Sequence, residues 1–455
     1  MRRRIAAVTA AAIMGTLAAA PGGTSSEEEA VQQPNVLIVI TDDQRAGTLK
    51  VMPRTRRWMK RGGTTFPSAF ATTPLCCPSR ASIYTGRYAH NHGVRTNDDP
   101  TRLDQGTTIQ RLAQDAGYRT AFFGKFFNRW TTNPLHFDHW ETFHGVARYK
   151  RPEMNVNGTV REFSRYSTDL LGARASRRIS AWSGRPWLMY VAPIAPHAPY
   201  TPKHRDARAP VGRWPGNPAV FERDRSDKPE WVRARSSTFR RGARIRRRQL
   251  RTLLAVDRMV DRLMRTLGQT GQRRDTLVVF LSDHGLLWGE HGLGQKQSPY
   301  TASVRIPLMV RWPGHVARGA VDGRLAGTVD VVPTILEAAG IGPAPGAPPD
   351  GRSLLDPGWE RDHVLLEFQK RQGKGVPSWA SLRGTQEQYA EYYDDAEAVS
   401  FREYYDLAND PWQLRNLLGD GSTGNDPPAG HLEALLTALA RARVCEGTVG
   451  ATACP

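Results

Sequence analysis

Asn35–Thr41 reads NVLIVIT, a continuous apolar run rich in β-branched side chains, and it ends at Asp42 and Asp43. Such a run is typical of a strand that is buried on both faces of a parallel sheet. Further runs of this kind recur along the chain at residues 119–123, Trp187–Ala192, 276–281 and 306–310. Helical patterns lie between them, at residues 108–116 and 246–267.

This alternation of strands and helices predicts an α/β fold with a large, doubly wound, mixed but mostly parallel sheet flanked by helices. Ligands of such sheets bind at the carboxyl ends of the strands. The Pro- and Gly-rich residues 340–351 (GIGPAPGAPPDG) predict a linker. Beyond it, strand-like pieces and a final helical pattern follow at Val364–Phe368, 389–393 and 431–443. We therefore predict a large α/β domain at residues 34–345 and a smaller C-terminal α+β domain at residues 360–455.

The chain is strongly basic, with 63 Lys and Arg against 44 Asp and Glu and a formal net charge of +19. This charge favours polyanionic partners. Nucleic acid is not expected, because the arginines are spread along the chain and no helix-turn-helix, zinc-finger or RNP-type pattern directs them at bases. An anionic substrate and a basic, solvated surface both remain open. For the densest basic stretch, residues 240–251, a solvated helix start is favoured over a polyanion site, because the apolar helical face continues through it.

The first residues resemble an export signal. Three arginines at residues 2–4 precede a short apolar run at residues 5–20, which is too brief to span a bilayer comfortably. We predict a signal peptide and flexible N-terminus over residues 1–30, a secreted or extracytoplasmic protein, and no stable membrane insertion. A membrane anchor is the alternative.

Four cysteines occur, as one adjacent pair and one distant pair. In an oxidising compartment Cys445 and Cys454 could close a small C-terminal loop. Cys76 and Cys77 are neighbours in sequence and therefore poor disulfide partners. They need another explanation.

Residues 74–87 (PLCCPSRASIYTGR) provide it, because Cys76 begins a C-x-P-S-R pattern that T-G-R follows. This pattern resembles the signature of the type I sulfatases of the alkaline phosphatase superfamily. The resemblance implies that a formylglycine-generating enzyme oxidises Cys76 to Cα-formylglycine, while Cys77 occupies the variable position. A hydrated aldehyde suits sulfate transfer, because one hydroxyl attacks sulfur and the other later expels the sulfate.

Acidic residues follow two of the predicted strands. Asp42 and Asp43 end the first strand, and Asp283 and His284 follow the run at residues 276–281, so both pairs are expected at one edge of the sheet, where they could bind a hard cation. The resemblance implies Ca²⁺, or Mg²⁺, with Asp42, Asp43, Asp283 and His284 as ligands. Many sulfatases have Asn in place of His284, whereas those similar to the N-acetylglucosamine-6-sulfatases carry Asp-His.

Four basic residues match positions that hold sulfate or move protons in this family. The resemblance implies that Arg80 steadies the hydrated formylglycine, that Lys125 and Lys296 bind sulfate, and that His197, in A-P-H-A-P, protonates the leaving alcohol. Phe127 stands where many sulfatases have a histidine, which is also the case in the N-acetylglucosamine-6-sulfatase type. The base for the final elimination is therefore unassigned.

The sequence thus predicts a sulfatase that hydrolyses sulfate monoesters, with a lean towards N-acetylglucosamine-6-sulfate or heparan-type substrates. A segment at residues 404–417 (YYDL, then DP and NL) is similar to the family's C-terminal docking segment and says nothing of substrate. Two alternatives remain: a phosphonate or phosphate ester hydrolase of the same superfamily, and a noncatalytic polyanion-binding protein in which Cys76 is never converted.

Overall fold

The computed structural model describes residues 33–370 and 375–455, so the signal peptide predicted for residues 1–30 lies outside the described residues. Within this described part, no helix combines the length and the apolar composition that crossing a membrane requires. Its strands form a nine-stranded sheet, a four-stranded sheet and a two-stranded ribbon.

The nine-stranded sheet is built around five parallel strands, and the buried apolar runs supply four of them. In sheet order the strands are β2 (Thr64–Thr65), β10 (Leu308–Arg311), β9 (Thr276–Ser282), β1 (Asn35–Thr41), β8 (Trp187–Ala192), β4 (Arg119–Gly124), β5 (His139–Phe143), β6 (Glu153–Val156) and β7 (Thr159–Glu162). The strands from β9 to β5 are parallel, and those at both edges are antiparallel. The run predicted at residues 306–310 forms one of these antiparallel strands, β10. The predicted mixed, mostly parallel α/β class is confirmed.

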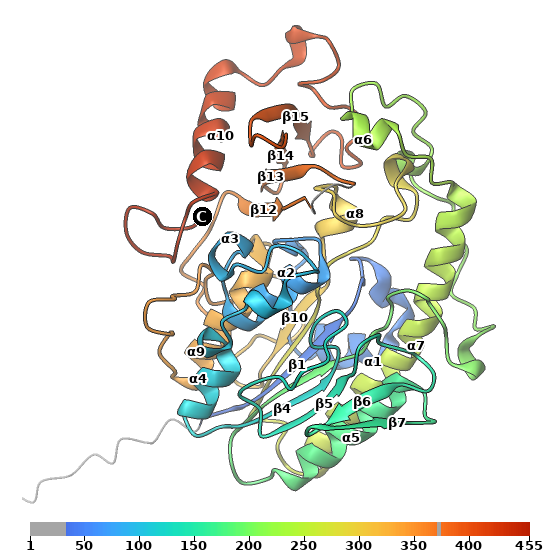
Figure 1. The fold of residues 1–455 in the computed structure, drawn as a ribbon, viewed down its shortest axis with the longest axis vertical. Coiled ribbons are helices and arrows are strands. Elements are labelled where there is room, and N and C mark those ends of the chain that lie inside the picture. Colours follow the sequence, from blue (N-terminus) through green and yellow to red (C-terminus); the bar gives the residue numbers. More distant parts are fainter. Residues whose placement is uncertain (1–32, 371–374) are drawn as a thin grey trace, which may run out of the picture. The chain divides into compact units, whose positions relative to one another are not determined.

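Helices cover both faces of this sheet, as the two-sided burial of β1 requires (Figure 1). The odd-numbered side chains Leu37 and Val39 share a core with helices α5 (Ser167–Ala181) and α7 (Phe239–Gln269). The even-numbered side chains of β1 share the opposite core with α2 (Cys76–Thr85), α4 (Ile109–Asp115) and α9 (Val331–Ala339). The periodicity of the strand therefore fixes which helices lie on which side.

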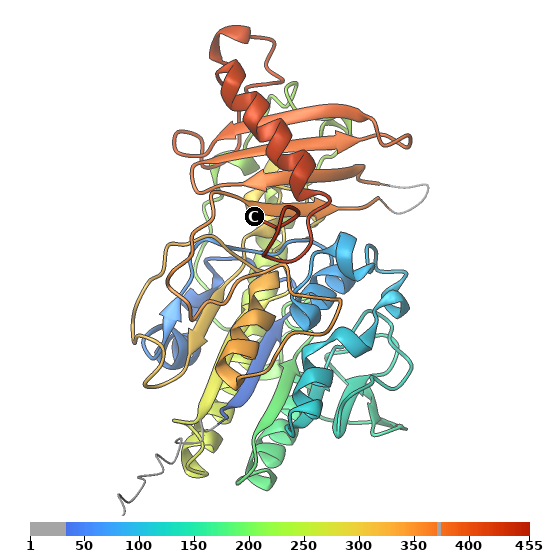
Figure 2. The same cartoon turned by 90° about the vertical axis from the view of Figure 1, so that its left-hand side faces the viewer.

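The four-stranded sheet is antiparallel and lies in the C-terminal part of the chain (Figure 2). Its strands are β12 (Val364–Phe368), β13 (Ser378–Arg383), β14 (Glu387–Tyr393) and β15 (Val399–Asp406). Helix α10 (Ala429–Ala442) packs on it, and a disulfide joins Cys445 to Cys454. Side chains of β12 and β13 form a core with Phe70, Leu75 and Val304. The domain limits 34–345 and 360–455 stay predictions.

Candidate active site

The carboxyl ends of β1 and β9 bring two acidic pairs together. These strands are parallel neighbours, and Thr41 is in register with Ser282. The backbone N–H of Asp43 donates to Asp283 Oδ1 at 3.0 Å, and that of Gln44 donates to Ser282 Oγ at 2.9 Å. Asp43 itself adopts a left-handed conformation, with φ of 68°. The chain therefore turns sharply at the sheet edge, and both pairs face one centre.

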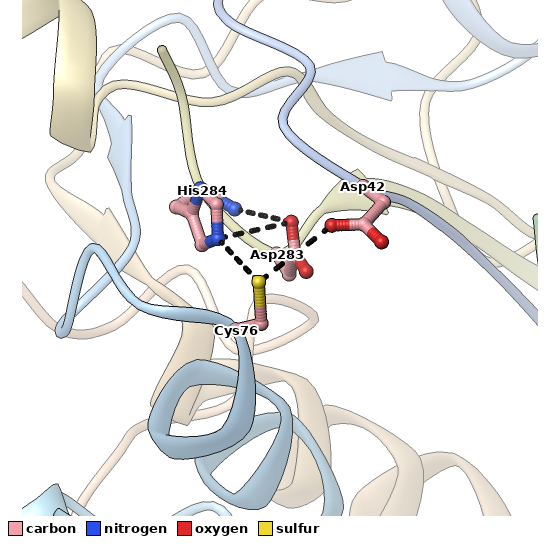
Figure 3. A group of neighbouring side chains, drawn as sticks. All are labelled: Asp42, Cys76, Asp283 and His284. Atoms are coloured by element: carbon pink, nitrogen blue, oxygen red, sulfur yellow. Dashed lines mark hydrogen bonds and ion pairs between the residues drawn. The ribbon is translucent and has the colours of Figure 1, made fainter. Parts of the chain in front are cut away.

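Cys76 reaches the same centre from the first residue of α2 (Figure 3). Its Sγ lies 3.4 Å from His284 Nε2, 3.8 Å from Asp42 Oδ1 and 3.1 Å from Lys296 Nζ. The Ser79 hydroxyl donates to the Asp283 carbonyl and so ties α2 to the end of β9. A nucleophile at the start of a helix is well placed for an anionic substrate, because the positive end of the helix dipole points at it.

Each of the three carboxylates contacts a basic side chain. Arg80 Nε donates to Asp283 Oδ2 at 3.0 Å. Lys125 Nζ donates to Asp42 Oδ2 at 2.5 Å, and Lys296 Nζ donates to Asp43 Oδ1 at 2.7 Å. Arg80 is fully buried, and its Nη2 lies 3.0 Å from Asp283 Oδ2 without a well-directed hydrogen bond in the described part of the chain. One guanidinium N–H is therefore available to an oxygen bound at this centre.

His197 completes the cluster from the loop that follows β8. Its Nε2 lies 3.8 Å from Asp43 Oδ2, and its Nδ1 lies 2.8 Å from the Ala198 carbonyl. Since a carbonyl only accepts hydrogen bonds, Nδ1 donates there and Nε2 faces the centre. The His197 side chain is 30% exposed, whereas that of Asp43 is 3% exposed. His197 is thus the member of this pair that is open to an incoming molecule.

The surrounding charges and burial give the thiols of the two neighbouring cysteines very different pKa values. Burial alone would raise the pKa of the Cys76 thiol, but Lys125, Lys296 and His284 outweigh it and hold this pKa well below its ordinary value. Burial raises the pKa of the Cys77 thiol to about 12. For His197, burial would lower the pKa, but the carboxylates of Asp43 and Asp42 raise it to about 9. Cys76 therefore has the reactive environment, and His197 holds a proton at neutral pH.

The donor atoms fit a divalent cation. Ligand atoms of Asp42, Cys76, Asp283 and His284 lie within 4.8 Å of one another, as do those of a second, overlapping set that includes Asp43 and His197. Carboxylate oxygens are the ligands that Ca²⁺ and Mg²⁺ prefer. The imidazole of His284 is the less typical donor for such an ion, and its Nδ1 lies 3.0 Å from the Gly285 carbonyl.

All nine residues that the sequence singled out lie in this one cluster. They are Asp42, Asp43, Cys76, Arg80, Lys125, His197, Asp283, His284 and Lys296. Phe127, in place of the frequent histidine, is buried against the rings of Tyr84, Phe126 and Trp130. This position therefore supplies packing, and the base for the elimination step stays unassigned.

Gln249 is a supporting residue that the sequence analysis missed. It lies on α7, and its amide donates to the Asp43 carbonyl at 3.3 Å and to the Pro196 carbonyl at 3.2 Å, while its oxygen accepts from Trp288 Nε1 at 2.7 Å. It thereby joins the Asp43 turn to the His197 loop. A buried amide among the apolar positions of a helix was the available signal, since such a group needs partners.

The fold and this cluster define an α/β protein that has a candidate metal site and a cysteine at the carboxyl edge of its sheet. The family model described as sulfatase matches residues 34–341. A second model, described as N-sulphoglucosamine sulphohydrolase, C-terminal, matches residues 289–426. The chain belongs to the sulfatase family.

Several named proteins are similar to this chain. An extracellular sulfatase homologue of Caenorhabditis elegans is 33% identical over 379 residues, which cover 76% of this chain and 51% of the relative. The chain thus spans about half the length of that relative. The human N-acetylglucosamine-6-sulfatase is 28% identical over 448 residues, covering 83% of this chain and 80% of the relative.

Solved structures share the fold at lower identity. One, in complex with D-glucosamine-2-N,6-O-disulfate, superimposes with a TM-score of 0.80 at 22% identity and covers 90% of this chain and 97% of its own. The phosphonate monoester hydrolase of Agrobacterium radiobacter gives a TM-score of 0.71 at 22% identity and covers 89% of this chain and 95% of its own. At this identity the likeness concerns the fold alone.

Proposed function

We propose that this protein hydrolyses sulfate monoesters of sulfated carbohydrates, with N-acetylglucosamine-6-sulfate or a heparan-type chain as the favoured substrate. The observation that carries the proposal is the position of Cys76, whose Sγ lies at the helix start within 3.8 Å of His284, Asp42 and Lys296. In this proposal a formylglycine-generating enzyme converts Cys76, and the mature protein acts outside the cytoplasm.

Two groups would supply chemistry that the unmodified side chains lack. Formylglycine at position 76 supplies a hydrated aldehyde as the nucleophile for sulfur. A Ca²⁺ or Mg²⁺ ion, held by Asp42, Asp43, Asp283 and His284, supplies positive charge beside the sulfate oxygens.

The remaining side chains bind, orient and move a proton. Lys125 and Lys296 attract the sulfate group, and the free N–H of Arg80 donates to an oxygen at position 76. His197 gives its Nε2 proton to the leaving alcohol oxygen, because Nδ1 donates to the Ala198 carbonyl and Nε2 faces the centre. All these donors are fixed before substrate arrives, which is the condition for electrostatic stabilisation of a transition state.

The names of the relatives support a carbohydrate substrate. The family model covers the catalytic edge, and the human relative is an N-acetylglucosamine-6-sulfatase that aligns over 80% of its length. Within this chain, the Asp283-His284 pair and Phe127 are the residues that favour the N-acetylglucosamine-6-sulfatase type over other sulfatases. A phosphonate or phosphate ester hydrolase is the second candidate, and the shared fold of the Agrobacterium radiobacter enzyme favours it.

The test is peptide mass spectrometry across residues 71–87 of alkylated protein from a conversion-competent host, beside turnover of matched aryl sulfate, phosphate and phosphonate esters. We expect position 76 to have lost its sulfur, Cys77 to be alkylated, and the sulfate ester to be the preferred substrate. Two alkylated cysteines with no turnover would reject the enzyme and favour the polyanion-binding alternative. A preference for the phosphonate ester would favour the second candidate.

A further inference from the structure

The basic stretch at residues 240–251 forms the start of α7, and its arginines divide into two kinds. Arg246 is buried, and its guanidinium donates to the Gly212 carbonyl at 3.0 Å and packs over the Trp288 ring. Arg241, Arg244 and Arg248 are exposed. Spacings of three and four residues place these three on one side of the helix. We call them the arginine track.

A first hollow joins the arginine track to the candidate active site. It has a volume of about 270 Å³, and Arg241, Arg235, Trp231 and Lys296 are among its lining residues. Lys296 also contacts Cys76 Sγ and Asp43. A molecule whose ester lies at Cys76 and whose remainder enters this hollow therefore reaches Arg241.

A second hollow continues along the helix. Its volume is about 500 Å³, and Tyr200, Arg241, Arg244 and Arg248 line it. Tyr200 belongs to the loop of the candidate active site, because its backbone N–H donates to the His197 carbonyl at 3.1 Å. Arg241 lines both hollows. The two hollows thus form a path with positive charge along it that starts beside His197 and Lys296.

The sequence pattern of residues 240–251 favours a solvated helix start, but two hollows are lined by arginines of this stretch. We propose that the arginine track binds further anionic groups of the same sulfated polysaccharide chain whose sulfate ester is hydrolysed at position 76. This inference rests on the proposed function and extends it: the substrate is a multiply sulfated chain rather than a lone monosaccharide. The track spans eight residues of helix, or roughly 10 Å from Arg241 to Arg248, so it covers more than one anionic group. Guanidinium groups bind oxyanions through two parallel N–H donors, and a polyanion gains affinity by releasing its counterions.

The helix offers a matched control. Arg240 and Arg247 are exposed on α7 as well, but neither lines the two hollows. The pairs Arg241→Glu/Arg244→Glu and Arg240→Glu/Arg247→Glu change the net charge equally. Each pair also puts one Glu into the first helical turn, where the dipole favours it. Equal melting temperatures of both variants would establish that the fold is intact.

Binding is measured first, on full-length protein carrying Cys76→Ala, against a heparin decasaccharide over a series of salt concentrations. We expect the track pair to weaken affinity by about tenfold or more and to reduce the slope of log affinity against log salt by about two, with less than about a threefold change for the control pair. Equal losses in both pairs would overturn the proposal, because only general charge would then matter.

Turnover is measured second, on protein with Cys76 intact. We expect the track pair to hydrolyse 4-nitrocatechol sulfate as the parent does, and to lose about tenfold in kcat/KM on the polymeric glycan. Equal turnover of the glycan by parent and track pair would overturn the proposal. If no sulfate ester is hydrolysed by the parent while decasaccharide binding still depends on the track pair, the proposed function fails and the binding surface stands.

Discussion

Glu403 and Asp42 are two buried acids whose surroundings are built differently. In the C-terminal sheet, Glu403 of β15 is fully buried and accepts hydrogen bonds of 2.7 to 2.8 Å from the hydroxyls of Tyr300, Tyr392 and Tyr405. At the carboxyl edge of the large sheet, Asp42, which is also fully buried, accepts from Lys125 and has its other oxygen 3.8 Å from Cys76 Sγ.

The two acids differ in the charge of the side chains around them and in their pKa values. Glu403 accepts hydrogen bonds from three neutral hydroxyls, and burial raises its pKa although the charge of Lys228 and these hydrogen bonds oppose it. Lys125 and other cations lower the pKa of Asp42 to about 2 although burial opposes them, and Arg80 Nη2 lies 3.0 Å from Asp283 Oδ2 without a well-directed hydrogen bond in the described residues. A buried acid that accepts hydrogen bonds from neutral hydroxyls holds a fold together, whereas one surrounded by basic side chains beside a reactive cysteine can take part in binding or chemistry.

The largest expected effect separates Cys76 from Cys77. Cys76→Ala removes the proposed nucleophile, so we expect sulfate ester turnover to fall by at least about 10³-fold with an unchanged melting temperature. Cys77→Ala removes a buried thiol that faces the Asn97 carbonyl and the Asn128 N–H, and turnover should stay within about threefold. Stopped assays of sulfate release and thermal melts check both. Equal losses of turnover in the two variants would contradict the assignment of the nucleophile to Cys76 rather than Cys77.

Chelation is expected to affect one cluster only. A Ca²⁺ or Mg²⁺ ion beside the sulfate oxygens would contribute several kcal/mol to the transition state, so we expect chelator to lower turnover by about 10²-fold or more and added cation to restore it. The Glu403 cluster uses protein hydroxyls alone. Turnover is therefore compared with near-ultraviolet circular dichroism of the buried tyrosines before and after chelation. Full activity in the presence of chelator would contradict a cation at this site.

The sequence predicted the catalytic edge better than the C-terminal sheet, for a physical reason. Strands buried on both faces, such as Asn35–Thr41, leave a continuous apolar pattern, and the residues that follow them must lie at one edge. β15 has no such pattern, since several of its residues are exposed, and the analysis missed both it and β13. Gln249 was missed because its partners are backbone carbonyls, which a sequence does not position.

The proposed structural role of Glu403 is tested by measuring stability. Glu403→Ala leaves the hydroxyls of Tyr300, Tyr392 and Tyr405 without their acceptor, and we expect a loss of about 3–5 kcal/mol in the free energy of unfolding. Glu403→Gln keeps one acceptor oxygen and should lose about 1–2 kcal/mol. Urea unfolding measures both. Turnover per folded molecule should match the parent, and a selective loss of activity would assign Glu403 a part in the chemistry.

Glu387 of β14 gives the smallest and most specific effect, because it is a partly exposed acid with titratable partners. It accepts from His363 Nε2 at 3.0 Å, from His431 Nε2 at 2.7 Å and from the Tyr404 hydroxyl at 2.9 Å. The hydrogen bond from His363, together with those from His431 and Tyr404, lowers the pKa of Glu387 from 4.5 to about 2 although burial opposes them. Stability from a lowered carboxyl pKa is present above pH 4.5 and is lost as pH falls towards 2.

Glu387→Gln should therefore flatten the fall in melting temperature between pH 5 and pH 3, by an amount worth about 1 kcal/mol or less because solvent screens the group. Melting curves of parent and variant at closely spaced pH values measure it. Glu387 resembles Glu403 in accepting three hydrogen bonds from side chains and resembles Asp42 in its lowered pKa. If the melting temperatures of parent and variant fall in parallel with pH, the hydrogen bonds of Glu387 do not contribute to stability at this partly exposed position. A lowered pKa would then not identify a stabilising acid unless the acid is also buried.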